Sequence, residues 1–279
     1  MTPLEILLGY IDEDCPNGDI TSEVVTPDVF CNAIIKAESD GIIAGLEEAK
    51  LLFSHFGISV NSTFLDGDYV CKGSLLLSIK GNARAILLVE RTVLNIIGRM
   101  SGIATQTRKM VEAIFPVNPK CRVAATRKTC PGFRRFDKKA VVIGGGESHR
   151  FCLSDGIMIK DNHLVLVSLN EAVSAAKKST RYKKIEVEVE TPEAALDAAL
   201  GGADVILLDN MSYEKMRDTL SRLKQSGLRE RLVIEVSGGV NEQSIKEFAS
   251  LDVDVISMGA LTHTVRNFSV NLEIVPESN

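Results

Sequence analysis

One pattern repeats along the second half of the chain and limits the folds open to it. A short apolar run ends in polar or glycine residues, and a helix-like stretch follows before the next run. The runs lie at residues 122–125, 156–159, 185–189, 205–208, 232–236 and 255–258. Strands that alternate with helices in this way form βα units around a parallel sheet. We count about six units, where a complete barrel has eight, so the pattern predicts an α/β domain over residues 106–265 and argues against a complete eight-fold barrel.

The first part of the chain lacks this rhythm. Strand-like pieces at 32–37 and 75–79 lie around a helix-like stretch at 45–56, and glycine turns occur at 66–68 and 72–73. This mixture predicts a separate α+β domain over residues 1–105. We expect the C-terminal segment 266–279 to join it.

A longer helix is predicted from Ala83 onward. When residues 86–100 are wound at about 100° per residue, Glu90 lies inside an apolar arc and Arg91 lies at its border. The arc consists of Ile86, Val89, Val93, Ile96, Ile97 and Met100. The periodicity therefore marks Glu90, rather than Arg91, as the unusual residue of this helix.

Composition and charge narrow the choice of ligand. The 279 residues are 45% hydrophobic, which allows a sizeable core. The net charge of −5 argues against a general nucleic-acid binder, because such proteins neutralise phosphates with an excess of Lys and Arg. Cations nevertheless crowd between residues 122 and 160, at Arg122, Arg127, Lys128, Arg134, Arg135, Lys138, Lys139, Arg150 and Lys160. Such a block in an acidic chain predicts a small, highly anionic ligand.

The sequence also bears on location. No apolar stretch approaches the ~20 residues that span a bilayer, and the N-terminus carries acids where a secretory signal carries basic residues. We therefore expect a cytosolic protein with no membrane partner. The six cysteines are scattered without paired spacing, so we interpret them as reduced thiols.

Polar residues at the strand ends are candidates for chemistry, because a parallel barrel binds its ligand at the C-terminal ends of its strands. Lys160 either forms a Schiff base or pairs with an anionic ligand, and the surrounding arginines favour pairing. Glu190 and Asp209 follow neighbouring strands. Their carboxylates suit ribose hydroxyls, magnesium held through water, or acid and base work. They equally suit the capping of the next helices.

Two glycine-containing strand ends indicate a phosphate site. Ser237-Gly238-Gly239 and Ser257-Met258-Gly259 offer backbone N–H groups near helix starts, although ordinary tight turns have the same composition. His149 follows three glycines at 144–146 and stands in a cationic setting. His263 lies past the last strand end, and its role stays open.

An ordered set of motifs runs along nearly the whole chain. It consists of Gly18-Asp19-Ile20-Thr21, Glu90-Arg91-Thr92, Ser101-Gly102-Ile103-Ala104-Thr105, Thr126-Arg127-Lys128-Thr129, Pro131-Gly132, Gly144-Gly145-Gly146, His149-Arg150, Ser154-Asp155-Gly156, Ile159-Lys160-Asp161-Asn162-His163, 186–190, Leu208-Asp209-Asn210, Ser237-Gly238-Gly239 and 257–263. In this order the set resembles the quinolinate phosphoribosyltransferase family. The ordered set is far more specific than any one of its members.

The resemblance implies a fold and an activity. The fold would be an N-terminal α/β sandwich with a partly open α/β barrel, in a head-to-tail homodimer or a hexamer of such dimers. The activity would be that of a pentosyltransferase in NAD biosynthesis. It would join quinolinate to phosphoribosyl pyrophosphate and release carbon dioxide and pyrophosphate, giving nicotinate mononucleotide, with magnesium as cofactor.

The resemblance also implies roles for particular residues. Arg127, His149, Arg150 and Lys160 would hold the two carboxylates of quinolinate, Lys128 would share this anionic site, and Arg91 would arrive from the partner subunit. Glu190 and Asp209 would meet the ribose hydroxyls and magnesium. Ser237, Gly238, Gly259 and His263 would line the phosphate side. Lys160, Glu190 and Asp209 would be the catalytic set.

Two rival functions remain at this stage. One is a molybdate-transport-associated relative of the same fold with a binding or accessory role, against which the run Lys160-Asp161-Asn162-His163 argues. The other is nicotinate phosphoribosyltransferase, whose substrate carries one carboxylate. The dense set of Arg and Lys favours a dicarboxylate.

Overall fold

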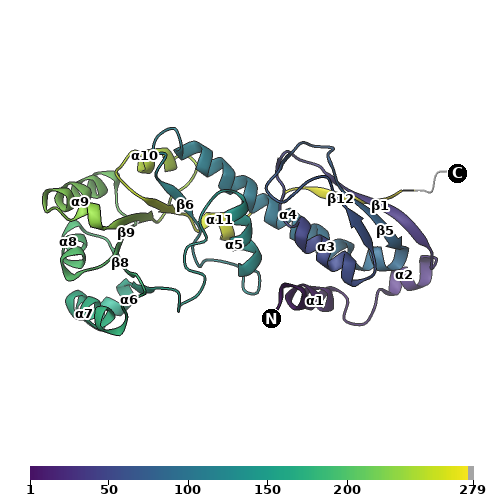
Figure 1. The fold of residues 1–279 in the computed structure, drawn as a ribbon, viewed down its shortest axis with the longest axis horizontal. Helices are drawn as coiled ribbons and strands as arrows, with labels where there is room; N and C mark the ends of the chain where they lie inside the picture. Colours follow the sequence, from purple (N-terminus) through teal and green to yellow (C-terminus); the bar gives the residue numbers. More distant parts are fainter. Residues whose placement is uncertain (276–279) are drawn as a thin grey trace. The chain divides into compact units, whose positions relative to one another are not determined.

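The protein was examined as a computed structural model, which describes residues 1–275. The chain forms two compact units (Figure 1). The first contains Met1–Gln106, Arg135–Gly144 and the chain from Val265 onward, and the second contains Thr107–Arg134 and Gly145–Thr264. The predicted boundaries lie close to these divisions, with one difference. The segment 135–144 was expected in the barrel and belongs to the first unit.

Charged side chains explain why this segment joins the first unit. Helix α5 (Arg134–Ile143) carries Asp137, whose buried carboxylate accepts hydrogen bonds of 2.8 and 3.0 Å from the guanidinium of Arg99. Lys139 of the same helix donates to Glu47 at 2.6 Å and Glu48 at 2.7 Å. These partners lie far away in the sequence, so local periodicity gave no sign of them.

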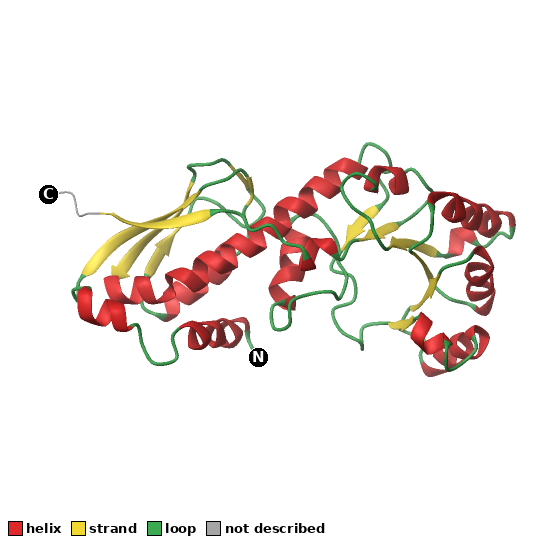
Figure 2. Cartoon of the chain, turned by 180° about the vertical axis from the view of Figure 1, so that it is seen from behind, coloured by secondary structure: helices red, strands yellow, loops and turns green. Residues whose placement is uncertain are grey.

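The first unit is built on an antiparallel sheet with the strand order β12-β1-β5-β3. The strands are β1 (Phe30–Ala37), β3 (Ser59–Asn61), β5 (Leu75–Asn82) and β12 (Val270–Val275). Helices α3 (Leu46–His55) and α4 (Ala83–Ile114) run along one face of this sheet (Figure 2). The C-terminal segment thus enters the unit through β12, and residues 276–279 of that segment lie outside the described residues. Short elements complete the unit, namely α1 (Pro3–Asp14), α2 (Ile20–Val25), β2 (Gly41–Ile42) and β4 (Tyr69–Val70).

Helix α4 is longer than the sequence pattern indicated, with 32 residues that continue into the second unit. All six residues of the predicted apolar arc are buried, the most exposed of them being Ile96 at 2%. Glu90 is half-buried and Arg91 is exposed. Gly102 of this helix packs against the backbone of Arg266, where a side chain would not fit. The periodicity thus identified the buried face of the helix correctly.

The second unit contains a six-stranded parallel sheet in the order β6-β11-β10-β9-β8-β7. The strands are β6 (Arg122–Ala124), β7 (Ile157–Ile159), β8 (Ile185–Val189), β9 (Val205–Asp209), β10 (Val233–Ser237) and β11 (Val255–Ser257). The helices are α6 (Asp161–Leu164), α7 (Leu169–Ser179), α8 (Pro192–Gly201), α9 (Tyr213–Gln225), the 3-10 turn Arg229–Arg231, α10 (Ile245–Ala249) and α11 (Ala260–His263). No pairing joins β6 to β7 among the described residues, so the sheet is open. The predicted fold class is confirmed.

Burial along strands β9 and β10 shows which of their side chains face outward, toward the helices, and which face the barrel interior. Ile206, Leu208, Ile234 and Val236 are completely buried. Since side chains alternate along a strand, the intervening residues of these strands face the barrel interior. Within residues 1–275, no helix is long and apolar enough to cross a membrane.

Candidate active site

Polar side chains occupy the inward face of three neighbouring strands. Glu186 and Glu188 of β8, Asp209 of β9, and Glu235 and Ser237 of β10 alternate with apolar residues. The strand register pairs Glu188 with Leu207, Leu207 with Glu235, and Asp209 with Ser237. Glu188 and Glu235 therefore form one level of the barrel interior, Asp209 and Ser237 form the next level toward the strand ends, and Glu186 lies one level deeper.

Glu188, Asp209, Glu235 and Ser237 line a cavity of about 450 Å³, a size typical of small-molecule sites. Its lining residues all belong to the second unit. They are Ala125, Thr126, Arg127, Lys128, His149, Arg150, Met158, Lys160, Glu188, Leu207, Asp209, Glu235, Ser237 and Ser257. Seven of the residues singled out from the sequence are among them, namely Arg127, Lys128, His149, Arg150, Lys160, Asp209 and Ser237. The barrel thus brings together groups that are up to 110 positions apart in the sequence.

The cavity carries positive charge that the protein does not fully neutralise. Four Lys and Arg side chains and His149 line it, against the carboxylates of Glu188, Asp209 and Glu235. The buried Nε of Arg127 has no hydrogen-bond partner among the described residues. Burial and the neighbouring Arg127 lower the pKa of Arg150, because both disfavour its positive charge. An anionic ligand would relieve this repulsion.

Lys160 forms an ion pair with Glu188 inside the cavity. Lys160 directly follows β7, whose last residue, Ile159, is paired with Val187 of β8. The next register position therefore sets Lys160 beside Glu188, which explains the pair. Glu188 was not singled out from the sequence, although the alternation of Glu and Val over 186–190 was a usable signal. In a regular strand, alternation places the side chains of Glu186, Glu188 and Glu190 on the same face, so all three are expected either inside the barrel or outside it.

Glu190 does not lie where the sequence interpretation required. Strand β8 ends at Val189, so Glu190 stands one residue past the ordered strand. Its side chain is exposed and does not line the cavity. Thr191 begins the following turn and caps helix α8, with its side chain accepting from the backbone N–H of Ala194. Glu190 therefore lies outside the cavity, which Glu188 of strand β8 lines.

His149 lies between the cavity and two buried carboxylates. Its Nε2 is 3.2 Å from Oε2 of Glu235, a hydrogen-bond distance, and 3.7 Å from Oε2 of Glu186, an ion-pair distance. Burial alone would lower the pKa of His149, but the contacts with Glu186 and Glu235 outweigh it and raise the pKa to about 9. Burial also raises the pKa of Glu186. Neither glutamate was predicted as a site residue.

The loop after β10 is shaped by contacts with the strand end of β9. Asn210 adopts a left-handed conformation with φ 50°, its amide donates to Asp209 at 2.7 Å, and its backbone N–H donates to the carbonyl of Ser237 at 3.1 Å. A Cβ on Gly238 would lie 2.7 Å from the backbone nitrogen of Asn210. Non-glycine residues with positive φ are uncommon and gather at functional sites.

Other predicted residues lie at the edge of this arrangement. Gly238 and Gly259 follow the lining residues Ser237 and Ser257 but do not line the cavity themselves. A Cβ on Gly259 would lie 3.0 Å from both the ring of His263 and the side chain of Lys128, so this glycine fits between them. The hydroxyl of Thr262 donates to the carbonyl of Lys128 at 2.8 Å and ties the two segments together. Arg91 belongs to the first unit.

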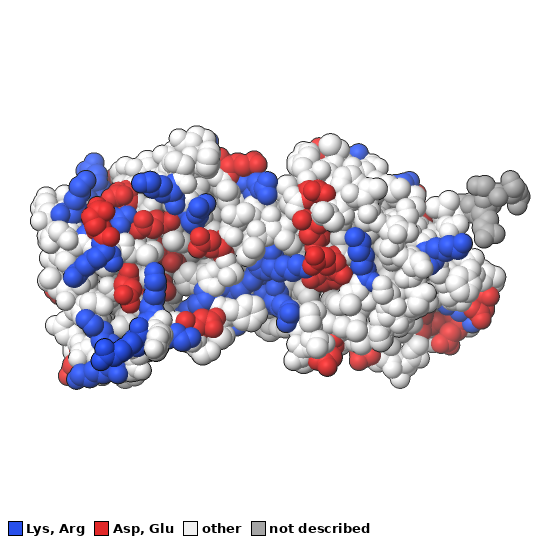
Figure 3. Space-filling view, in the orientation of Figure 1, with Lys and Arg blue, Asp and Glu red and all other residues white. Residues whose placement is uncertain are grey.

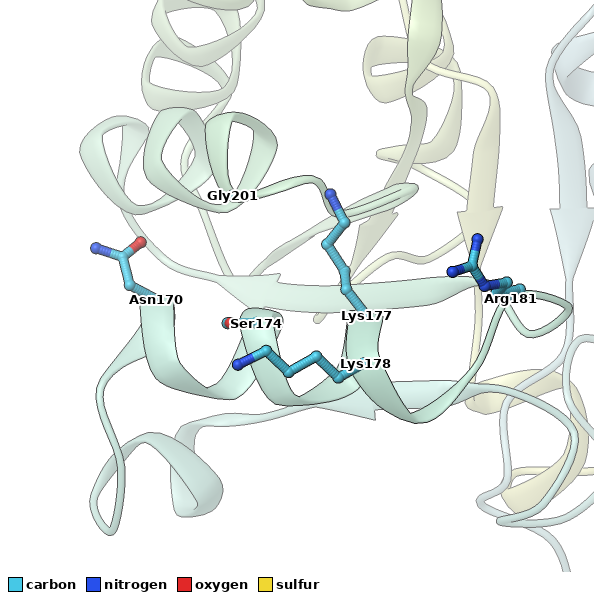
Figure 4. Close-up of a pocket in the computed structure, with 6 residues that line it drawn as sticks. All are labelled: Asn170, Ser174, Lys177, Lys178, Arg181 and Gly201. Atoms are coloured by element: carbon cyan, nitrogen blue, oxygen red, sulfur yellow. The ribbon is translucent and has the colours of Figure 1, made fainter.

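A second hollow, of about 620 Å³, is less suited to chemistry. It lies over α7 and the end of α8 and is lined by Asn170, Ser174, Lys177, Lys178, Arg181 and Gly201 (Figure 4). Basic side chains gather over α7 at the lower left of Figure 3. The polar groups of this hollow are all exposed, and none comes from a strand end. The strand-end cavity is therefore the candidate active site.

Comparison with known proteins agrees with this geometry. The model of the quinolinate phosphoribosyl transferase C-terminal domain matches residues 103–273, and that of the N-terminal domain matches residues 19–101. The probable nicotinate-nucleotide pyrophosphorylase (carboxylating) of Methanothermobacter thermautotrophicus is 43% identical over 97% of this chain and 98% of its own length. The human nicotinate-nucleotide pyrophosphorylase (carboxylating) is 33% identical over 95% of this chain and 89% of its own.

A solved structure extends the agreement to the fold. The crystal structure of NadC from Streptococcus pyogenes superposes with a TM-score of 0.89 at 35% identity, covering 99% of both chains. Both family models match, in order, and together they span most of the sequence. On this evidence the chain belongs to the quinolinate phosphoribosyltransferase family.

Proposed function

We propose that this chain transfers a phosphoribosyl group from phosphoribosyl pyrophosphate to quinolinate and releases pyrophosphate and carbon dioxide, giving nicotinate mononucleotide. The observation that carries the proposal is the strand-end cavity, in which an excess of cations lies beside Asp209 and Ser237. The cations suit the two carboxylates of a pyridine dicarboxylate, and Asp209 and Ser237 suit the hydroxyls and phosphate of a sugar phosphate. Neither rival function is favoured, because the family models and the curated relatives all carry the name of the decarboxylating enzyme or its domains.

The cations would bind quinolinate. Arg127, His149, Arg150 and Lys160 line the cavity and would pair with the two carboxylates, and Lys128 would share them at the exposed rim. Arginine forks suit carboxylates because two N–H groups meet two oxygens. The ammonium of Lys160 would be held between Glu188 and the ligand. This arrangement favours an anion-pairing lysine over one that forms a Schiff base, because the amine already pairs with the carboxylate of Glu188.

The strand ends of β9 and β10 would bind the phosphoribosyl donor. Asp209 would meet the ribose hydroxyls, and Ser237, Gly238, Gly259 and His263 would line the phosphate side. Asp209 is the acid of the predicted magnesium pair that lines the cavity, and its oxygens suit this hard cation. We therefore propose that Asp209, directly or through water, holds magnesium, which would neutralise charge on pyrophosphate. The exposed Glu190 is the weaker candidate.

The chemistry then requires mainly positioning. The bond between ribose C1 and pyrophosphate breaks as the pyridine nitrogen bonds to C1, and the leaving group takes the electron pair. The quaternised nitrogen next stabilises the electron pair left on the adjacent ring carbon when its carboxylate departs as carbon dioxide, and that carbon takes a proton. The residues of the cavity would orient both substrates and exclude water during these steps.

The assembly of the protein is also a proposal. We propose a homodimer, or a hexamer of such dimers, in which the exposed Arg91 of one subunit completes the quinolinate site of its neighbour. An exposed guanidinium on the first unit suits such a role. The cytosolic location stays a prediction.

A direct assay tests the function. Purified protein would be incubated with quinolinate, phosphoribosyl pyrophosphate and magnesium, and the product identified by mass spectrometry. We expect nicotinate mononucleotide only when all three are present, and loss of turnover with a chelator. Equal turnover of nicotinate, or turnover unaffected by chelation, would contradict the proposal.

A further inference from the structure

At the candidate active site lies a buried cluster in which His149 contacts two glutamates that have no role in the proposed chemistry. It consists of His149, Glu186 and Glu235, with side chains that are 15%, 10% and 4% exposed. Within the described residues, these two carboxylates are the only acids within 4 Å of the imidazole nitrogens. They come from β8 and β10, whereas His149 comes from the loop before β7. The cluster therefore exists only when the barrel is folded.

We propose that Glu186 and Glu235 are positioning residues that keep His149 as an imidazolium ion and turn its second ring nitrogen toward the substrate. Both glutamates approach Nε2. This leaves Nδ1–H as the ring donor available to a carboxylate in the cavity. The site would then keep this cation throughout the neutral pH range. The inference deepens the proposed function and rests on quinolinate binding in the cavity.

Charge balance supports the protonated ring. Two buried carboxylates without cations would be costly. Arg150 and a protonated His149 balance them, with Arg150 acting on Glu186 through its charge. Burial opposes the charge on His149, yet the two glutamates raise its pKa to about 9. Because the folded pKa is raised, the charged form is complete well below pH 9 and is lost as the pH rises through that value.

Other charged groups share the two hollows around His149 and act in opposite directions. The cations there are Arg127, Lys128, Arg150, Lys160, Lys183 and Lys184, whose charge disfavours a further positive charge on the ring. The acids are Asp155, Glu188 and Asp209, whose charge favours it, in addition to Glu186 and Glu235. Since Coulomb energy falls with distance, the pair in contact with Nε2 dominates. Removing the charge of either glutamate should therefore be visible in the titration of the ring.

The backbone at His149 has an uncommon conformation. Its φ of 53° lies in the left-handed region, which residues with a Cβ rarely adopt and which is frequent at functional sites. The ring contacts with the two glutamates accompany this conformation.

A divalent metal is the competing occupant of this cluster. One ligand atom from each of the three residues lies within 4.8 Å of the others, and Oε1 of Glu186 has no hydrogen-bond partner in the described part of the chain. A metal would require a neutral imidazole. The positive charge of Arg150, which already acts on Glu186, would repel a divalent cation bound there. The imidazolium is therefore the better account, and metal binding becomes an outcome of the test.

The experiment measures the ring directly. The chain has four histidines, so ring signals of protein labelled with ¹⁵N-histidine are assigned by His149→Asn and followed by NMR from pH 6 to 10. We expect wild-type His149 to titrate near pH 9 and Glu235→Gln or Glu186→Gln to move this titration below about pH 8. Glu147→Gln, an exposed acid in the same loop, is the control and should change nothing.

Kinetics give the second measurement. In Glu235→Gln the KM for quinolinate should rise at least about fourfold between pH 6.5 and 8.5, while the KM for phosphoribosyl pyrophosphate stays constant and kcat changes little. Wild-type KM should be nearly flat over this range. A purely structural role would lower activity equally at every pH. The ring titration needs no substrate, so failure of the proposed function would appear as absent turnover with the titration intact.

Two results would overturn the inference. One is a wild-type His149 that loses its proton below pH 7.5, which does not depend on the folding of any variant. The other is stoichiometric binding of Zn²⁺ or Mn²⁺ to chelator-treated wild type that Glu235→Gln abolishes, measured by calorimetry. A thermal unfolding scan of each variant verifies that the barrel remains folded.

Discussion

Glu188 and Glu190 differ by two positions in the same alternating run, yet one lines the cavity and the other does not. The difference arises because strand β8 ends at Val189. Strand periodicity alone places both side chains on the same face. At the scale of single residues, the end of a strand therefore decides which carboxylate lines the cavity.

This pair makes a matched test of the site. We expect Glu188→Gln to lower kcat/KM strongly, because the substitution leaves Lys160 without its ion-pair partner. We expect Glu190→Gln to change the transition-state energy by no more than ~0.5 kcal/mol, as exposed substitutions usually do. Steady-state kinetics with both substrates measure the effect. A larger loss of kcat/KM in Glu190→Gln than in Glu188→Gln would support the role that the sequence predicted for Glu190.

The cations give a prediction about binding. Truncation of one partner in a buried charge pair costs about 2–5 kcal/mol, so Arg150→Ala should weaken quinolinate binding by roughly 30-fold or more. Lys160→Ala should weaken it by less, because the Lys160 side chain is 40% exposed. Isothermal titration calorimetry measures this directly. Lys178→Ala, an exposed cation on α7 outside the cavity, is the control. Wild-type affinity in either cavity variant would remove that residue from the proposed site.

Connections between elements depend on close contacts that sequence patterns describe only partly. Gly238 and Gly239 both have positive φ, at 88° and 63°. A Cβ on Gly238 would meet the backbone of Asn210, whereas a Cβ on Gly239 would meet nothing within 4 Å. Gly238 is therefore required both by its positive φ and by its close contact with Asn210, whereas Gly239 is required by its positive φ alone.

Alanine substitutions separate these two requirements. Gly239→Ala should cost about 1–2 kcal/mol of stability through backbone strain. Gly238→Ala should lower stability further, because the added Cβ displaces Asn210. It should also reduce turnover, because Asn210 donates a hydrogen bond to Asp209. Thermal unfolding and activity assays on both variants measure the difference. Equal losses of stability with unchanged turnover in both would show that the contact with Asn210 is unimportant.

Helix α5 is tied to α4 by the pair between Arg99 and Asp137. The Asp137 side chain is fully buried, so Arg99→Met should leave a buried carboxylate without its main cation. Breaking a buried pair in this way costs about 3–5 kcal/mol. Chemical denaturation measures the loss. Lys36→Met, which breaks an exposed pair with Glu273, is the control and should cost at most ~1 kcal/mol.

At the scale of the whole molecule, the proposed dimer would share its sites between subunits. Arg91→Ala and Asp209→Ala proteins should each be nearly inactive, because every site lacks one element. In a mixed dimer both lesions fall in one site and the other stays intact. Random mixing gives about half mixed dimers, so roughly a quarter of all sites should recover.

Co-refolding of the two variants in equal amounts, followed by an activity assay, tests this sharing. Native mass spectrometry verifies that subunits have exchanged. Activity no greater than the average of the two parents, despite exchange, would mean that Arg91 acts within its own chain or not at all.

The sequence by itself determined the periodic features of this protein. The spacing of apolar runs predicted six parallel strands because each βα unit must bury a strand and a helix face locally. The apolar arc of α4 and the cation-rich strand ends followed from side-chain order in the same way. Seven of the residues predicted from the sequence line the strand-end cavity.

Only the tertiary structure decided the features that depend on register and on distant partners. The assignment of segment 135–144 to the first unit depends on pairs such as Arg99 with Asp137, 38 positions apart. The choice of Glu188 over Glu190 depends on where β8 stops. The placement of His149 depends on Glu186 and Glu235, which come from separate strands. Local patterns do not encode such contacts, because they form only when the sheet brings distant residues into one register.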